Sequence, residues 1–254
     1  MPAGRRKDID MTPNFGATRS DIRSRHALLT PESHEWIIQP GWEGAEFSCL
    51  ISPDMGAKFA MFLLRFPADC MAPPALPGVA RFLLCLEGEF QLDASTTLNT
   101  GDFAFLPPED TAALRITQGS RLVLFEWCFL ASGPVPAALH GSVDAVTGQP
   151  LRGNDWLIVQ KLLPTDPAFD AEFNVMTFHP GASLAYVETH FMEHGLLFLD
   201  GGGVYRLDDR WYPVEAGDAI WMGPHVPQWF GALGRTPARY LIYKNYNRSP
   251  LARR

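Results

Sequence analysis

Short apolar runs separated by turn residues recur along the chain, and no long stretch has the 3.6-residue period of an amphipathic helix. Gly, Pro, Asn and Asp lie between the runs, as is typical of strands joined by tight turns. This spacing predicts an all-β sandwich or barrel. The predicted strands are residues 58–66, 81–86, 89–92, 103–106, 122–127, 173–178, 196–199, 204–207, 219–222 and 238–246.

Two of these segments occur twice in the same order, which indicates an internal duplication. Residues 81–88, RFLLCLEG, match residues 194–201, HGLLFLDG. Residues 101–108, GDFAFLPP, match residues 217–224, GDAIWMGP. One such match could arise by chance, but two in order and at a nearly constant offset predict two copies of one β-domain.

The repeat divides the chain into two β-barrels with flanking segments. We expect an extended N-terminal arm over 1–27, a first barrel over 28–130, a linker over 131–154, a second barrel over 155–247 and a tail over 248–254. The arm mixes Arg, Asp, Pro and Gly, and the linker is rich in Gly, Pro and Ala, as expected for segments outside a packed core.

The second copy contains polar side chains with the spacing of metal ligands. Glu188 and His190 are two residues apart, so on a strand they would point to the same face. His194 begins the next predicted strand, and Gln228 arrives from a separate hairpin. Four such donors can occupy part of an octahedron and leave positions for water or substrate. The alternative is that the histidines are ordinary surface or core residues and that Glu-x-His is a solvated strand face.

The first copy provides an internal control for this interpretation. Its residues at the equivalent positions are Ala75, Pro77, Arg81 and Ala112, which cannot bind a metal together. We therefore predict one divalent metal ion, in the second barrel, and a structural first barrel. Two imidazoles, a carboxylate and an amide oxygen favour Mn²⁺, and Fe²⁺ fits next best. The remaining positive charge would favour a substrate carboxylate.

Further polar candidates lie on the last predicted strand, where Tyr240, Ile242, Lys244 and Tyr246 share one face. If this face points inward, Tyr240 and Lys244 enter the cavity near the metal, and Lys244 can hold an anion as a point charge. Tyr205 could add a hydroxyl from a neighbouring hairpin. The alternative is a tyrosine in the core and a lysine on the outer face.

Composition restricts the function classes. Hydrophobic residues make up 46% of the chain, which permits a packed core, and the net charge of -7 argues against nucleic acid as a partner. No apolar run is long enough for a membrane span, and the N-terminus lacks the apolar region of a signal peptide. The four cysteines form no CxxC pair, which favours reduced thiols in the cytoplasm.

In the second copy Gly181 precedes the three candidate ligands, which are followed by Gly201, and Gly217 precedes Gln228. This spacing resembles the two cupin motifs. Here Glu and His exchange places within the first motif, and Gln replaces the usual fourth His. This variation resembles the (S)-ureidoglycine aminohydrolase family of purine (allantoin) degradation. The resemblance covers about residues 15–246, and the segments YVETHFMEHGLLFLDGGGVYRL and GDAIWMGPHVPQWFGALG have most of its specificity.

The resemblance implies a bicupin and a cytoplasmic, homo-oligomeric Mn²⁺ enzyme. Its small anionic substrate would be (S)-ureidoglycine, converted to (S)-ureidoglycolate and ammonia. Family substrate contacts would fall on Tyr205, Tyr240 and Lys244, of which Tyr240 and Lys244 are also the catalytic candidates. The general base stays open between these two and a water on the metal. A cupin dioxygenase and a non-catalytic metabolite-binding cupin are the alternative functions.

Overall fold

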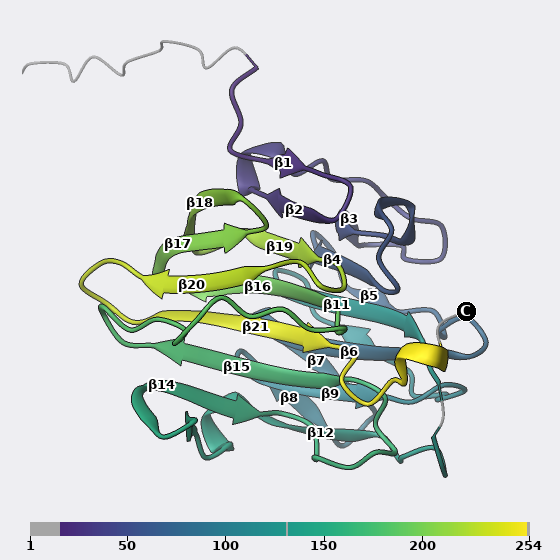
Figure 1. Cartoon of the computed structure of the whole chain (residues 1–254). Coiled ribbons are helices and arrows are strands. Elements are labelled where there is room, and N and C mark those ends of the chain that lie inside the picture. The colour runs from purple at the N-terminus through teal and green to yellow at the C-terminus, as the bar shows by residue number, and fades with distance from the viewer. Residues whose placement is uncertain (1–15, 131, 253–254) are drawn as a thin grey trace, which may run out of the picture.

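The computed structural model describes residues 16–130 and 132–252, and these are almost entirely β structure (Figure 1). The strands are β1 (Asp21–Ile22), β2 (His26–Leu29), β3 (Glu46–Ile51), β4 (Ala60–Arg65), β5 (Cys70–Met71), β6 (Val79–Glu87), β7 (Glu89–Gln91), β8 (Thr97–Asn99), β9 (Asp102–Leu106), β10 (Arg115–Ile116), β11 (Arg121–Cys128), β12 (Leu139–Ser142), β13 (Gln149–Leu151), β14 (Asn154–Lys161), β15 (Glu172–Phe178), β16 (His194–Asp200), β17 (Gly202–Leu207), β18 (Arg210–Glu215), β19 (Ala219–Met222), β20 (Gln228–Ala232) and β21 (Ala238–Lys244). The helical elements are the short 3₁₀ turns η1 (Pro31–Ser33), η2 (Pro53–Met55), η3 (Val143–Ala145) and η4 (Pro250–Ala252). The all-β prediction is confirmed, and each predicted strand overlaps an observed one.

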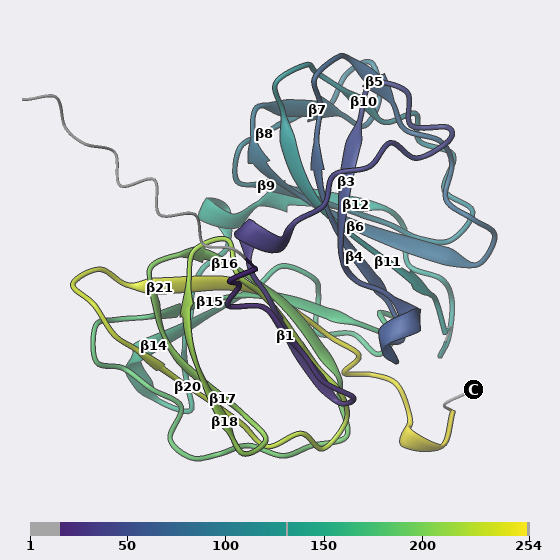
Figure 2. The ribbon, with the colours of Figure 1, turned by 90° about the horizontal axis from the view of Figure 1, so that it is seen from above.

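The strands form two barrels that lie side by side (Figure 2). The first barrel has a six-stranded sheet, β12-β9-β6-β11-β4-β3, and a four-stranded sheet, β5-β10-β7-β8. The second has an eight-stranded sheet, β1-β2-β19-β16-β21-β15-β14-β13, and a three-stranded sheet, β18-β17-β20. No helix among the described residues is long and apolar enough to cross a membrane.

The internal repeat is visible in the pairing of the strands. In the first barrel β6 lies between β9 and β11, and in the second β16 lies between β19 and β21. Arg81 pairs with Leu106 across β6 and β9, and His194 pairs with Met222 across β16 and β19. These four residues are also the partners in the aligned sequence segments, so the predicted duplication is confirmed down to single positions.

One hydrophobic core joins the two barrels. Alternate residues of β15 and β21 point away from the second barrel and pack on the outer face of the first, namely Phe173, Val175, Leu241 and Tyr243. Phe173 stacks on Phe82 with ring centroids 3.8 Å apart, and Tyr243 lies 4.3 Å from Phe59. All four side chains are fully buried. Aromatic rings bury the most apolar area of any side chain, so this contact fixes how the barrels sit against each other.

Two segments expected to lie outside the barrels contain strands. Residues 1–15 of the predicted arm lie outside the described residues, but β1 and β2 form a hairpin that extends the sheet of the second barrel through β19. The predicted linker contains β12, which pairs with β9, and β13, which pairs with β14. These strands are short and polar, so they show little of the apolar pattern that predicted the others. The exact bounds of the five segments stay a prediction.

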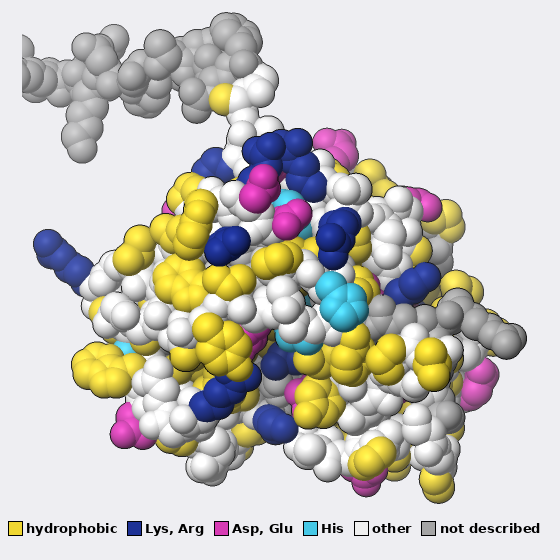
Figure 3. Space-filling model, in the orientation of Figure 1, with side chains coloured by type: hydrophobic (Ala, Val, Ile, Leu, Met, Phe, Trp, Pro, Cys, Tyr) yellow, Lys and Arg dark blue, Asp and Glu magenta, His cyan; other side chains and the backbone are white. Residues whose placement is uncertain are grey.

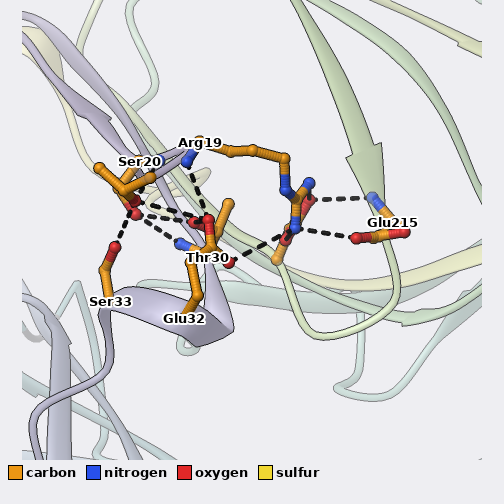
Figure 4. A network of polar contacts seen from close by, with 8 residues as sticks. Arg19, Ser20, Thr30, Glu32, Ser33 and Glu215 are labelled. Atoms are coloured by element: carbon orange, nitrogen blue, oxygen red, sulfur yellow. Dashed lines mark hydrogen bonds and ion pairs between the residues drawn. The ribbon is translucent and has the colours of Figure 1, made fainter. Parts of the chain in front are cut away.

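Arg19 anchors the start of the described chain to the second barrel (Figure 4). Its guanidinium donates two hydrogen bonds of 2.8 Å to the carboxylate of Asp218, whose side chain has no exposed surface. Burial raises the pKa of Asp218, and the guanidinium opposes that shift. The backbone N–H of Arg19 and the hydroxyl of Thr30 both donate to Glu32, which lowers the pKa of Glu32 to about 2. The arm is therefore held by charge-assisted hydrogen bonds.

We expect Arg19→Met to lower the free energy of unfolding by ~2–3 kcal/mol, because it leaves a buried carboxylate without its partner. Urea denaturation would measure the loss. The control is Arg121→Met, which removes an exposed guanidinium 3.8 Å from Glu87. That pair should contribute no more than about 0.5 kcal/mol. Equal effects of the two substitutions would contradict an anchoring role for Arg19.

Candidate metal and substrate site

The second barrel contains a partly open cavity of about 660 Å³. In the space-filling view, basic, hydrophobic and histidine side chains surround a hollow on this face (Figure 3). All the candidate site residues predicted from the sequence line it: Glu188, His190, His194, Tyr205, Gln228, Tyr240 and Lys244. The interior of the first barrel is instead filled by apolar side chains, among them Phe47, Phe66 and Phe90.

Gln228 and Glu188 are held next to each other by backbone hydrogen bonds. Gln228 begins β20, and its N–H and carbonyl exchange bonds of 2.9 and 2.8 Å with Glu188. Ser183 makes a second bridge, to Gly231. The five residue steps from Ser183 to Glu188 therefore lie opposite only three steps on β20, from Gly231 to Gln228. The extra residues form a bulge, in which Tyr186 is exposed. Glu188 and His190 thus lie on an irregular segment rather than on the regular strand that the sequence predicted.

Three of the four predicted donors meet at one point. The Nε2 atoms of Gln228 and His190 lie 2.7 Å apart, and the rings of His190 and His194 have centroids 4.7 Å apart. His194 is 3% exposed, and neither of its ring nitrogens has a hydrogen-bond partner among the described residues. Buried polar atoms normally have a partner, so a ligand for a bound cation is the plainest role for these nitrogens.

Glu188 is the donor that points elsewhere. Its carboxylate forms an ion pair of 3.3 Å with Arg152, which lies over the ring of Tyr186. Accordingly, within the described residues no group of three or more His, Cys, Asp and Glu side chains is close enough to hold a metal ion. His190, His194 and Gln228 can hold a divalent cation once the amide of Gln228 turns its oxygen toward the histidines, and Glu188 completes the set only by turning from Arg152. Sequence reasoning missed Arg152, whose only signal is an Arg-Gly turn in the predicted linker.

Burial sets the protonation of the site. It lowers the pKa of His194 well below the ordinary value, and the nearby Lys244 and His190 add to that effect. Burial also lowers the pKa of His190. Both imidazoles are therefore neutral, which is the form that binds metal. Burial raises the pKa of the Tyr205 and Tyr240 hydroxyls, which keeps them protonated as hydrogen-bond donors. Tyr205 donates to Gln228 Oε1 at 3.4 Å.

Lys244 lies on the inner face of β21, as its spacing from Tyr240 predicted. It pairs with Glu172 on β15 and with His194 on β16, so it lies directly beside a proposed metal ligand. Burial lowers its pKa, while the charges of Glu172 and Glu188 oppose the shift. Within the described part of the chain no carboxylate comes within 4 Å of its ammonium group. This cation is therefore available to an anion that enters the cavity.

The first barrel has an ion pair where the second has its histidine. Arg81, which is 6% exposed, donates to Glu126 at 2.7 Å and to the carbonyl oxygen of Pro73 at 2.6 Å. Glu126 is the strand partner of Arg81, just as Lys244 is the strand partner of His194. The position that would bind metal in the first barrel is thus occupied by a guanidinium with satisfied hydrogen bonds.

The first barrel also supports the segment that leads into His194. The backbone N–H of Lys58 lies 3.1 Å from both carboxylate oxygens of Glu193, and the N–H of Glu193 donates to Asn245. A side chain at Gly195 would meet the ring of Phe59 at 2.3 Å. The first barrel therefore approaches β16 so closely that only glycine fits beside the proposed ligand.

Comparisons with known proteins agree with this fold and site. The Cupin domain family matches residues 174–243. The (S)-ureidoglycine aminohydrolase of Arabidopsis thaliana is 40% identical, over 93% of this chain and 80% of its own. That of Escherichia coli is 32% identical, over 87% and 88%. The solved structure of protein Ylba from E. coli has a TM-score of 0.79 and 28% identity, over 92% and 96% of the two chains. These matches confirm the predicted cupin fold.

We expect His190→Ala to weaken metal binding by about 100-fold or more, because it removes a direct donor, while the barrel stays folded. Elemental analysis after dialysis would measure metal per chain, and thermal unfolding would report the fold. The unsubstituted protein should contain one metal per chain. Two metals per chain, or full metal content in the variant, would contradict a single site in the second barrel.

Proposed function

Because the chain belongs to the (S)-ureidoglycine aminohydrolase family, we propose that it hydrolyses (S)-ureidoglycine to (S)-ureidoglycolate and ammonia in allantoin degradation. The observation that best supports this is the cavity of the second barrel, in which neutral imidazoles and an unpaired ammonium face the same space. Such a cavity suits a small anionic substrate that also needs a metal.

Glu188, His190, His194 and Gln228 would hold the metal, which we propose to be Mn²⁺, with Fe²⁺ as the second candidate. When bound, a divalent ion supplies Lewis acidity and orients the substrate. In the net reaction the bond between the α-carbon and its amine breaks, ammonia leaves, and water supplies the new hydroxyl group. Lys244 would hold the substrate carboxylate, and the protonated Tyr205 and Tyr240 would donate hydrogen bonds to substrate oxygens. Either Tyr240 or Lys244 could also transfer a proton.

Ammonia release from freshly prepared (S)-ureidoglycine, combined with elemental analysis, tests this proposal directly. The same assay under argon separates hydrolysis from a cupin dioxygenase, since hydrolysis needs no O₂. A non-catalytic metabolite-binding cupin would bind the substrate without releasing ammonia. We also propose a cytoplasmic homo-oligomer. The four free cysteines are compatible with a reducing compartment, and analytical ultracentrifugation would measure the assembly.

We expect Lys244→Met to lower kcat/KM by about 100-fold or more with metal content unchanged, since loss of a charge-assisted contact costs about 2–4 kcal/mol. The matched control is Arg239→Met. It removes a cation from the same strand, but Arg239 lies outside the cavity and pairs with Asp200. Metal loss in Lys244→Met, or an unchanged kcat/KM, would contradict the proposed role of this lysine.

We expect Arg81→Ala to leave kcat/KM within about threefold of the unsubstituted enzyme and to lower the free energy of unfolding by ~1–3 kcal/mol. The variant loses a buried guanidinium and leaves its hydrogen-bond acceptors unpaired. Initial rates measured well below the melting temperature separate the two effects. Complete inactivity of a folded, metal-containing variant would show that the first barrel takes a direct part in the reaction.

A further inference from the structure

A second polar group in the cavity has no role in the mechanism above. Lys161 on β14 and Glu172 and Asn174 on β15 line the same space as the proposed metal ligands. Asn174 is 1% exposed and Glu172 is 7% exposed. Polar side chains so deeply buried normally have partners, so this group requires an explanation.

The hydrogen bonds of the group leave one atom unpaired. The ammonium of Lys161 donates to Glu172 Oε1 at 3.3 Å, and the amide nitrogen of Asn174 donates to Glu172 Oε2 at 3.3 Å. A carboxylate only accepts, so the amide nitrogen must face Glu172. The amide oxygen, Asn174 Oδ1, has no hydrogen-bond partner among the described residues. The neighbours thus orient a buried acceptor and leave it free for a ligand.

The register places Asn174 diagonally across from Lys244 on the neighbouring strand. Glu172 is the strand partner of Lys244, and Asn174 is two residues further on the same face. Such diagonal neighbours on adjacent strands lie about 7–8 Å apart. Side chains at two such positions can contact the two ends of a small molecule in which one carbon links a carboxylate to a ureido group that ends in N–H₂.

We propose that Asn174 recognises the terminal N–H₂ of a ureido group, with Glu172 holding its amide in position. This inference rests on the proposed function and adds the group that distinguishes a ureido acid from other small carboxylic acids. The amide oxygen repels a carboxylate and accepts from an N–H, while Lys244 attracts the carboxylate to the opposite end. The two side chains together orient the substrate across the cavity.

Binding of two stable acids to the metal-loaded full-length protein tests this subsite. N-carbamoylglycine has the terminal N–H₂, and N-acetylglycine has a methyl group in its place. Isothermal titration calorimetry should show about tenfold tighter binding of N-carbamoylglycine, equivalent to about 1.4 kcal/mol. Asn174→Leu should reduce this preference to about twofold or less. Should Asn174→Leu fail to fold, Asn174→Ala should give the same loss.

The control is Met176→Leu, which changes the next cavity-lining residue on the same face of β15 without removing a hydrogen-bond acceptor. It should keep the preference. No preference in the unsubstituted protein, or an undiminished preference in Asn174→Leu, would overturn the assignment. The reaction is tested separately: a preference for N-carbamoylglycine without ammonia release from (S)-ureidoglycine would refute the proposed reaction and support the subsite.

Discussion

The alternation of side chains along β15, β16 and β21 is the constraint on which the rest of the structure depends. One face of each strand belongs to the core between the barrels, and the other faces the cavity. On β21, Leu241 and Tyr243 pack between the barrels, whereas Tyr240, Ile242 and Lys244 line the cavity. A shift of one residue would exchange the two sets. Burial of large aromatic side chains, at about 2 kcal/mol each, therefore also determines which residues reach the substrate.

The two barrels differ in what fills their interiors: the first is packed with apolar side chains, and the second contains the cavity. A barrel filled with aromatic side chains is rigid but has no room for a ligand, and a barrel with a cavity loses packing contacts. The first copy is filled, and its outer face supports β16 through Phe59 and the backbone of Lys58. The second copy keeps the cavity and is stiffened from outside. This division explains why Gly195 follows His194: the supporting ring stands where a side chain would be.

Much of this arrangement could be predicted from the sequence. Period-two alternation and turn residues depend only on neighbours within a strand, and the repeat can be found by comparing the two halves of the chain. The ligand candidates and the inner face of β21 followed from the same spacing rule. Other features depend on contacts between residues far apart in sequence. Arg152 reaches Glu188 only because β13 joins the sheet, and the bulge after Ser183 depends on the register with β20. Nothing in the sequence distinguishes Asn174 from an ordinary strand residue, because its role follows from its hydrogen bonds.

The polar groups of the cavity form two sets with opposite requirements. His190, His194 and Gln228 are nearly uncharged together, and burial keeps the imidazoles neutral, so they can bind a cation. Lys244 and Lys161 place positive charge beside Glu172, and their excess favours an anion. Lys244 affects both sets. Its charge lowers the pKa of His194, and the same charge is available to bind a carboxylate. A ligand with a carboxylate near one end would offset the charge of this ammonium, and it would thereby weaken the electrostatic repulsion between Lys244 and a cation held by His194.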